Sequence, residues 1–251
     1  MESMQPPIIP DPQMKICLCE YLQLVPDCVP QIEALEGYDE TYLACYDHNI
    51  SDLEGIQYVC ANNGGLNSLD ISNNPIQSLS PIASHSNLTQ LSFGGSVGSD
   101  VSLDQILALS ESLTSLQIND YNVDVSLLAN FSNLTDLFLY AVNETFDPQS
   151  LASLMLLEYL VLMYVSMDTL KPLSELQHLS QFRLGGGSSN IYYGELSDVP
   201  NTIELLILLN VVIDANIFEQ MSDWSVLRKF EFQGVPIIFH LMGCLPMLSP
   251  N

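Results

Sequence analysis

The chain of 251 residues contains 30 acidic and only 5 basic residues, for a formal net charge of −25, and 47% of it is hydrophobic. So many apolar residues can form a packed core, which excludes a disordered chain. The negative charge disfavours nucleic acid and anionic membrane surfaces as partners, because binding either one requires Lys and Arg. A basic partner fits this charge, and so does the simpler interpretation that acidic residues keep an apolar protein soluble.

The N-terminal sequence MESMQPPIIPDPQ has neither the basic nor the apolar segment of a secretory signal. Either the protein stays in the cytoplasm or its true N-terminus lies upstream of this chain. Two short amphipathic segments follow. In PDPQMKICLCEYLQL the apolar residues have helical spacing behind a Pro and Asp start signal, and PQIEALEGY is the second segment. We expect both to form a helical cap within residues 1–40.

Five of the six cysteines lie in or near this cap, at positions 17, 19, 28, 45 and 60. Such clustering indicates disulfides and an oxidising compartment. Cys17 and Cys19 would point in different directions on a helix and would not share a partner. We expect one of them to pair with Cys28, whereas Cys45 and Cys60 fit small, unpaired core residues. The sequence CLC without a second pair is too weak a pattern for zinc, so we expect no metal site.

A repeat begins after the cap, with the pattern LxxLxLxxNxIxxL at 66–79. Its core LxxLxL returns seven times, at start-to-start intervals of 22, 25, 21, 23, 22, 24 and 24 residues. The eight units begin at Leu66, Leu88, Leu113, Leu134, Leu157, Leu179, Ile203 and Leu227. A weaker unit precedes them around Leu43, Cys45 and Ile50. Eight units in one register are a specific signal of the leucine-rich repeat.

One unit cannot bury its own hydrophobic face, so successive units must stack and share a core. Each LxL contributes a short strand whose alternate residues point inward. The predicted fold is therefore an α/β leucine-rich repeat solenoid: a curved parallel β-sheet on the concave face, an irregular or short-helical convex side, and a helical N-terminal cap. We expect an array of about nine units at 41–251. Its end, GCLPMLSPN, does not resemble a polar cap, so we expect a fragment that is incomplete at the C-terminus.

The order of PDPxxK, helix, short helix and NISDLEGIQY resembles the capped N-terminus of internalin-type leucine-rich repeat proteins, over residues 8–92. The resemblance implies a helical cap, a curved solenoid and the binding of another protein at a cell surface. The chain departs from the family at the asparagine that hydrogen-bonds the turn after each strand. Only Asn74 is present, and its equivalents are Ser96, Tyr121, Val142, Val165, Gly187, Val211 and Val235. Valine cannot satisfy buried amides, so those turns need other partners or water.

The most apolar stretch, LEYLVLMYV at 157–165, does not fit a transmembrane helix. Its apolar surroundings fall short of the usual ~20 residues and contain Glu158. Leu157, Leu160 and Leu162 are moreover in phase with the other seven units. We therefore expect a buried strand and no membrane-spanning segment.

The residues that flank the inward leucines should face the concave side. They are small and polar in the first three full units and become large from residue 136 onward. The predicted partner-binding site consists of Phe138, Tyr140, Tyr159, Val161, Met163, Arg183, Leu205, Ile207 and Leu209. Four strands span about 15 Å, and the exposed patch should reach roughly 400–800 Å², close to one partner's share of a standard interface. Self-association through this face and a departure from register are the alternatives.

No catalytic constellation emerges from the sequence. The four histidines are scattered over loops, and GGGSSN at 185–190 lacks the Lys and the helix of a phosphate-binding loop. We expect neither an enzyme nor a cofactor. The predicted function is a protein-binding module that is secreted or displayed at the cell surface, of the adhesin or receptor-ectodomain type. Five glycosylation sequons, at Asn49, Asn87, Asn130, Asn133 and Asn143, favour this setting. The alternative is a cytosolic scaffold similar to the leucine-rich repeat regulators of phosphatases.

Overall fold

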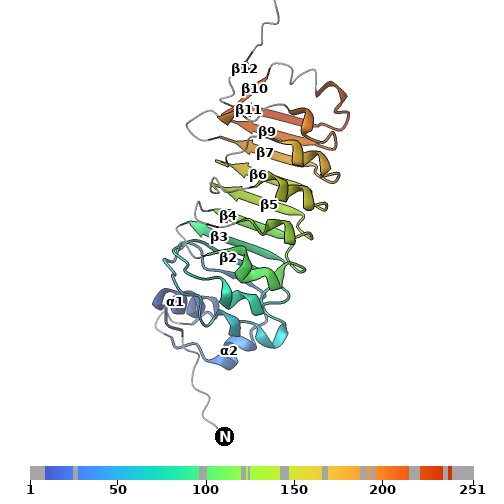
Figure 1. The fold of residues 1–251 in the computed structure, drawn as a ribbon. Helices are drawn as coiled ribbons and strands as arrows, with labels where there is room; N and C mark the ends of the chain where they lie inside the picture. The colour runs from blue at the N-terminus through green and yellow to red at the C-terminus, as the bar shows by residue number, and fades with distance from the viewer. Residues whose placement is uncertain are drawn as a thin grey trace, which may run out of the picture.

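The computed structural model describes residues 9–24, 28–95, 101–119, 123, 125–141, 147–165, 169–186, 191–192, 196–214, 221–233 and 237–238. The chain forms an elongated stack in which each unit adds one strand to a sheet and one short helix to the opposite side (Figure 1). Two α-helices lie at the N-terminal end of the stack.

The helices α1 (Pro12–Tyr21) and α2 (Ile32–Glu36) form the cap. Asp11 begins α1, because its carboxylate accepts hydrogen bonds from the amides of Gln13 and Met14 at 2.8 and 3.1 Å. One face of α1 is buried against the first units through Met14, Cys17, Leu18 and Cys19. The helix therefore covers the apolar end of the array, as the sequence predicts.

Two disulfides secure the cap: Cys19 pairs with Cys28 and Cys17 pairs with Cys45. Both cysteines of CLC are thus used, each with its own partner. The expectation that Cys45 is an unpaired core residue is wrong, because the cap helix lies against the first strand and brings Cys17 to it. Cys60 is a buried free thiol.

The strands pair in parallel, in chain order, as one sheet of nine strands within the described residues (Figure 1). They are β1 (Tyr42–Ala44), β2 (Ser68–Asn74), β3 (Gln90–Gly95), β4 (Ser115–Asn119), β5 (Asp136–Tyr140), β6 (Tyr159–Met163), β7 (Gln181–Gly185), β9 (Leu205–Leu209) and β11 (Lys229–Gln233). A second, small parallel sheet joins β12 (Ile237–Ile238), β10 (Val211–Asp214) and β8 (Ile191–Tyr192). The open parallel sheet is the one that the repeat period predicts.

Short 3₁₀ helices form the opposite, convex side of the stack. They are η1 (Ile56–Tyr58), η2 (Ala61–Asn63), η3 (Ser80–Ser84), η4 (Leu103–Leu109), η5 (Leu128–Asn130), η6 (Pro148–Ser153), η7 (Lys171–Glu175), η8 (Leu196–Asp198) and η9 (Met221–Asp223). Each helix from η3 to η8 buries apolar residues toward the sheet, such as Leu128, Leu151 and Leu173. The core is the layer between these helices and the strands.

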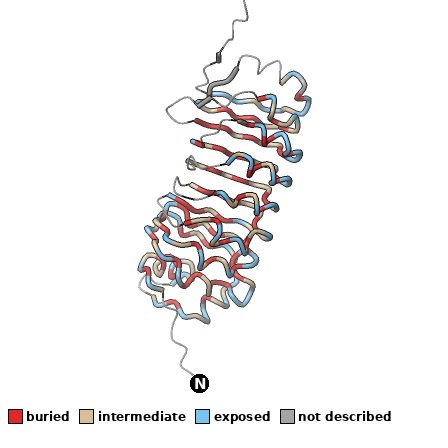
Figure 2. Tube along the Cα trace, viewed as in Figure 1, coloured by how far each residue is buried: buried red, intermediate tan, exposed pale blue. Residues whose placement is uncertain are grey.

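Burial alternates along the central strands (Figure 2). In β6 the inward residues Leu160 and Leu162 are fully buried, so the apolar stretch around them is a core strand. No helix in the described part of the chain is long and apolar enough to cross a membrane.

Asn74 makes five hydrogen bonds at the first turn of the array. Its amide nitrogen donates to the carbonyls of Cys45, Ile71 and Ser72, and its oxygen accepts from the amides of His48 and Ile50. Of the equivalent positions, Val165 and Val211 are fully buried, and Ser96, Tyr121, Val142, Gly187 and Val235 lie outside the described residues.

The turn keeps its backbone geometry even where the asparagine is replaced. The residue just before the asparagine position has a positive φ in five units: Asn73 (56°), Gly95 (116°), Ala141 (55°), Tyr164 (58°) and Asn210 (52°). This left-handed residue turns the chain out of the sheet, so the solenoid geometry is preserved without a continuous row of asparagines.

Candidate protein-binding face

Cross-strand register aligns the concave residues into straight rows. The middle row runs through Asp70, Ser92, Gln117, Phe138, Val161, Arg183, Ile207 and Glu231, each the Cα partner of the next. The nine predicted site residues therefore lie together on the neighbouring strands β5, β6, β7 and β9. We call these nine residues the apolar patch.

An aromatic pair and an arginine form the centre of the apolar patch. The rings of Phe138 and Tyr159 meet edge to face, with centroids 5.1 Å apart and an interplanar angle of 78°. The guanidinium carbon of Arg183 lies 5.4 Å from the centroid of the Tyr159 ring. Both contacts are favourable. The positive edge of one aromatic ring is attracted to the negative face of the other, and the positive guanidinium is attracted to the negative face of the tyrosine ring. The three side chains hold one another in place on a rigid sheet.

Two members of the apolar patch are less exposed than the sequence predicts. Val161 is 3% exposed and Ile207 is 9% exposed, so the expectation that both face water is wrong. Their register still places them in the middle row. In that row Val161 lies between the longer residues Phe138 and Arg183. Val161 and Ile207 thus form the floor of the patch, and the other seven members, which are all half-buried, form its walls.

Gly185 shapes the far side of this floor. A Cβ atom added at Gly185 would collide with the terminal methyl group of Met163, so the methionine side chain lies across the glycine. The sulfur of the same methionine is the next nearest atom, and the Cβ of Leu209 follows at 3.6 Å. A flexible thioether above a glycine can adapt to the shape of a partner.

Arg183 carries an uncompensated charge. The ion pairs among the described residues join Glu20 to His48, Glu204 to Arg228 and Glu231 to Lys229, and none of them includes Arg183. Its Nε atom is buried without a hydrogen-bond partner.

The phenol of Tyr140 responds to the same surroundings. Burial raises the pKa of Tyr140 and the neighbouring Tyr159 raises it further, while the charge of Arg183 opposes the rise. A tyrosine is protonated at neutral pH even with its ordinary pKa, and the raised pKa leaves Tyr140 in that form, as a hydrogen-bond donor.

Two concave residues outside the predicted site have features of their own. Asn119, the Cα partner of Tyr140, has a buried side-chain oxygen without a hydrogen-bond partner; nothing in its polar neighbourhood signalled this. Tyr42 is 55% exposed and pairs with Ser68 in the first row of the sheet. The phase of the weak first unit, in which Tyr42 directly precedes Leu43, could have found it.

The N-terminal half of the concave face is a shallow polar hollow. Its lining includes Tyr42, Asp70, Gln90 and Gln117. The polar groups here bond to one another: the Asp70 carboxylate accepts from the amide and hydroxyl of Ser72 at 3.0 and 2.6 Å. Such internally satisfied groups favour a solvated surface over a binding site.

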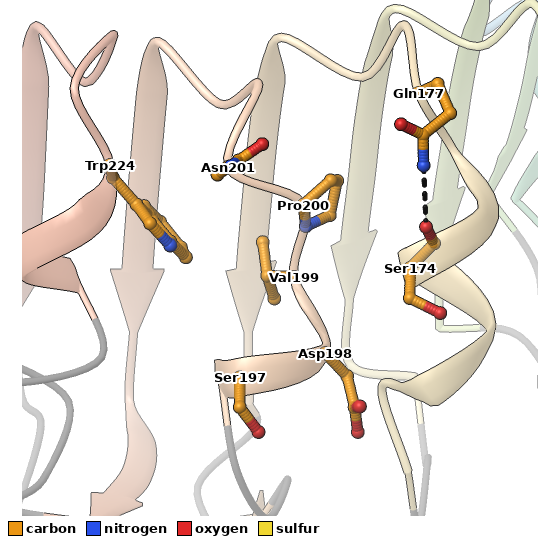
Figure 3. A pocket seen from close by; sticks show the side chains of 8 residues that line it. All are labelled: Ser174, Gln177, Ser197, Asp198, Val199, Pro200, Asn201 and Trp224. Carbon is orange, nitrogen blue, oxygen red and sulfur yellow. Dashed lines mark hydrogen bonds between the residues drawn. The ribbon is translucent and has the colours of Figure 1, made fainter.

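A second hollow of about 380 Å³ opens on the convex side between η7, η8 and η9 (Figure 3). It is lined by Ser174, Gln177, Ser197, Asp198, Val199, Pro200, Asn201 and Trp224. Gln177 is held by a 2.9 Å hydrogen bond to the carbonyl of Ser174, and Trp224 is largely buried. The hollow thus lies between packed units, and its charged lining residue is an acidic one, Asp198, where the apolar patch has a cation.

The described residues contain no group of three or more His, Cys, Asp or Glu side chains placed to hold an ion. The side-chain amides of Asn87 and Asn133 donate to the backbone of Asn63 and Glu111 in the preceding units. These two sequon asparagines therefore have packing contacts of their own.

No protein-family model matches the sequence, and no curated protein is significantly similar to it. Many solved structures, however, share the fold. Internalin C2 of Listeria monocytogenes is 23% identical with a TM-score of 0.69, and the alignment covers 93% of this chain and all 100% of that one. Internalin InlF of the same organism is 22% identical with a TM-score of 0.71, and the alignment covers 94% of this chain and 68% of that one. A third neighbour is the Arabidopsis receptor kinase HAESA, solved in complex with the peptide hormone IDA and the co-receptor SERK1. It is 20% identical with a TM-score of 0.55, and the alignment covers 78% of this chain and 34% of that one. The chain is thus a leucine-rich repeat solenoid with a helical N-terminal cap, and internalins are among its structural neighbours.

Proposed function

We propose that the protein is a non-catalytic recognition module that binds a protein partner through the apolar patch. The observation that carries the proposal is the stack of Phe138, Tyr159 and Arg183 on the concave sheet. Tyr and Arg are enriched at the energetic centres of protein interfaces. Because the three side chains contact one another, part of their conformational freedom is already lost before binding.

The setting that we propose is extracellular or at the cell surface. Two disulfides in the cap support an oxidising compartment. Neighbours with this fold include internalins and the ectodomain of a receptor that binds a peptide hormone. A cytosolic scaffold, the alternative setting, would have to keep Cys17, Cys19, Cys28 and Cys45 reduced.

A displayed library of random 12-residue peptides can test the binding face. We expect peptides selected on the wild-type protein to lose at least tenfold in affinity for Tyr159→Ser, because truncating a central aromatic costs about 1.4 kcal/mol or more. Tyr46→Ser is the matched control, since Tyr46 is also an exposed tyrosine but lies outside the patch. Selected peptides that bind both variants equally well would contradict the proposal.

Self-association through the same face is the competing outcome. It predicts that the purified protein is a dimer and that Tyr159→Ser converts it to a monomer. Analytical ultracentrifugation of both proteins distinguishes a face that binds a partner from one that binds a second copy of this chain.

A further inference from the structure

We infer that the partner presents a carboxylate group to Arg183, in a segment whose neighbouring side chains are apolar. This inference rests on the proposed function and adds the chemistry of the group that the patch recognises. It starts from an imbalance on the concave face: a strongly acidic protein keeps one of its few cations there without an acidic counterpart.

The chain has five basic residues, and the other two near this end of the sheet are already paired. Arg228 contacts Glu204 at 3.4 Å, and Lys229 contacts Glu231 at 2.6 Å. Arg183 instead contacts the face of Tyr159, which orients the guanidinium without neutralising it. The positive charge at the centre of the patch is therefore available to a partner.

The unpaired guanidinium indicates what that partner must supply. Arg183 is half-buried and its Nε atom is shielded from solvent, so an incoming acceptor would bind the part of the guanidinium that remains exposed. The planar guanidinium matches a carboxylate in a two-pronged geometry, and such charge-assisted bonds strengthen when water is excluded. The apolar floor of Val161 and Ile207 provides that exclusion once a partner covers it.

A second unmatched atom lies on the other side of the aromatic pair. Among the described residues, three have a buried side-chain nitrogen or oxygen without a partner, namely His85, Asn119 and Arg183, and two of these are on the concave face. Asn119 is on β4 and Arg183 on β7, three strand spacings across the sheet and two residues along it, or about 16 Å apart. An extended segment of about four or five residues spans this distance. Such a segment would cross the aromatic pair with its carboxylate at Arg183.

Charge also limits the partner as a whole. The net charge of −25 repels acidic molecules at long range, whereas the attraction to Arg183 acts at contact, within the screening length of about 8 Å at physiological salt. The segment should therefore carry an isolated carboxylate among apolar residues, on a partner that is neutral or basic overall.

Nuclear magnetic resonance of the arginine side chains tests the inference directly. The chain has two arginines, Arg183 and Arg228, so the ¹⁵N spectrum contains two Nε–H signals, which Arg183→Gln assigns. The probes are 3-phenylpropionate and its uncharged amide. We expect a saturable shift of the Arg183 signal with the carboxylate and at least tenfold weaker binding of the amide, with the Arg228 signal unmoved. An unmoved Arg183 signal, equal binding of the two probes, or an equal shift of Arg228 would overturn the inference.

The displayed peptides separate this inference from the proposed function. We expect selected peptides to contain Asp or Glu, and to lose about 10- to 100-fold in affinity for Arg183→Gln. Arg228→Gln is the matched control because it removes the same charge from a side chain that is 79% exposed. Changing the peptide Glu to Gln should cost affinity for the wild type and no further affinity for Arg183→Gln. Peptides that need Tyr159 but bind Arg183→Gln normally would overturn the inference and leave the proposed function standing. Peptides that need neither residue would overturn both.

Discussion

The carboxylate of Asp11 joins the cap to the first repeat unit through Ser51. One carboxylate oxygen accepts hydrogen bonds from the amide and the hydroxyl of Ser51 at 2.7 and 2.9 Å, and from the amide of Asp52 at 3.1 Å. The other oxygen caps α1 through Gln13 and Met14. A single buried side chain thus starts the helix and attaches it to the array.

Replacing Asp11 should weaken both connections. We expect Asp11→Ala to destabilise the fold by about 2–4 kcal/mol, the loss of a helix cap plus charged hydrogen bonds. Asp11→Asn should cost roughly half as much, since the amide keeps one accepting oxygen for α1 and loses the acceptor for Ser51. Urea unfolding measures both values. Equal stability of the two variants would show that the capping bonds to α1, which only Asp11→Asn retains, contribute nothing.

The cysteines provide a test of the cap and of the compartment. In denaturant without reductant, iodoacetamide should label Cys60 and leave Cys17, Cys19, Cys28 and Cys45 unlabelled. In the native protein Cys60 should react slowly as well, because burial raises the pKa of its thiol. Reduction should cost about 2–4 kcal/mol of stability per bridge. Peptide mapping by mass spectrometry reads the labels, and four labelled cap cysteines in unreduced protein would favour the cytosolic alternative.

His85 should make the stability of the fold depend on pH. The ring is almost fully buried, and its Nδ1 accepts a hydrogen bond from the amide of Leu66 at 3.2 Å. Burial lowers the pKa of His85 from 6.5 to about 4, and a contact with the backbone of Ile56 offsets this only in part. Between these values the unfolded chain binds a proton that the folded chain excludes. This contribution to stability is therefore complete above pH 6.5 and falls as the pH drops toward 4.

The fall should be on the order of 3 kcal/mol between neutral pH and pH 4. His85→Gln is the matched variant, since its side-chain oxygen can still accept from Leu66 but does not titrate. Asp11 does not contribute to the difference in pH dependence between the wild type and His85→Gln. Burial acts to raise the pKa of Asp11, but the bonds from Ser51, Met14 and Asp52 prevail and lower it below 3.8, so its contribution is lost only at more acidic pH. Urea unfolding at several pH values should show a steeper dependence for the wild type, and parallel curves would exclude His85 as the cause.

The sequence predicts the parts of this molecule that depend on period alone. The LxxLxL spacing gives the strand register, and with it the grouping of Phe138, Tyr159 and Arg183. It does not give the contacts of long side chains. Whether Val161 is buried depends on the side-chain conformations of its neighbours. The alternation of inward and outward residues does not determine those conformations. The pairing of Cys17 with Cys45 likewise depends on how the cap helix meets the first strand.

The sequence also does not predict which polar atoms lack a hydrogen-bond partner. A polar residue on a concave strand looks the same whether its partners are present or absent, so nothing distinguished Asn119 from Gln117. In the structure the side-chain oxygen of Asn119 lacks a hydrogen-bond partner. The candidate site is therefore predicted in its position and residue types, while its unmet hydrogen bonds are visible only in three dimensions.

Leu160 and Val161 are consecutive in β6, point to opposite faces of the sheet, and are both buried. Leu160→Ala removes core packing between units and should cost about 2–5 kcal/mol. Val161→Ala removes two methyl groups from a floor that only side chains of the same face cover, and should cost about 1–2 kcal/mol. Tyr159→Ser, at a half-buried wall position, should cost about 1 kcal/mol, the value of its aromatic and cationic contacts. Urea unfolding of the three variants should give this order. If Tyr159→Ser destabilises the protein as much as Leu160→Ala, then Tyr159 belongs to the structural core, and its loss of binding could no longer be attributed to the concave face.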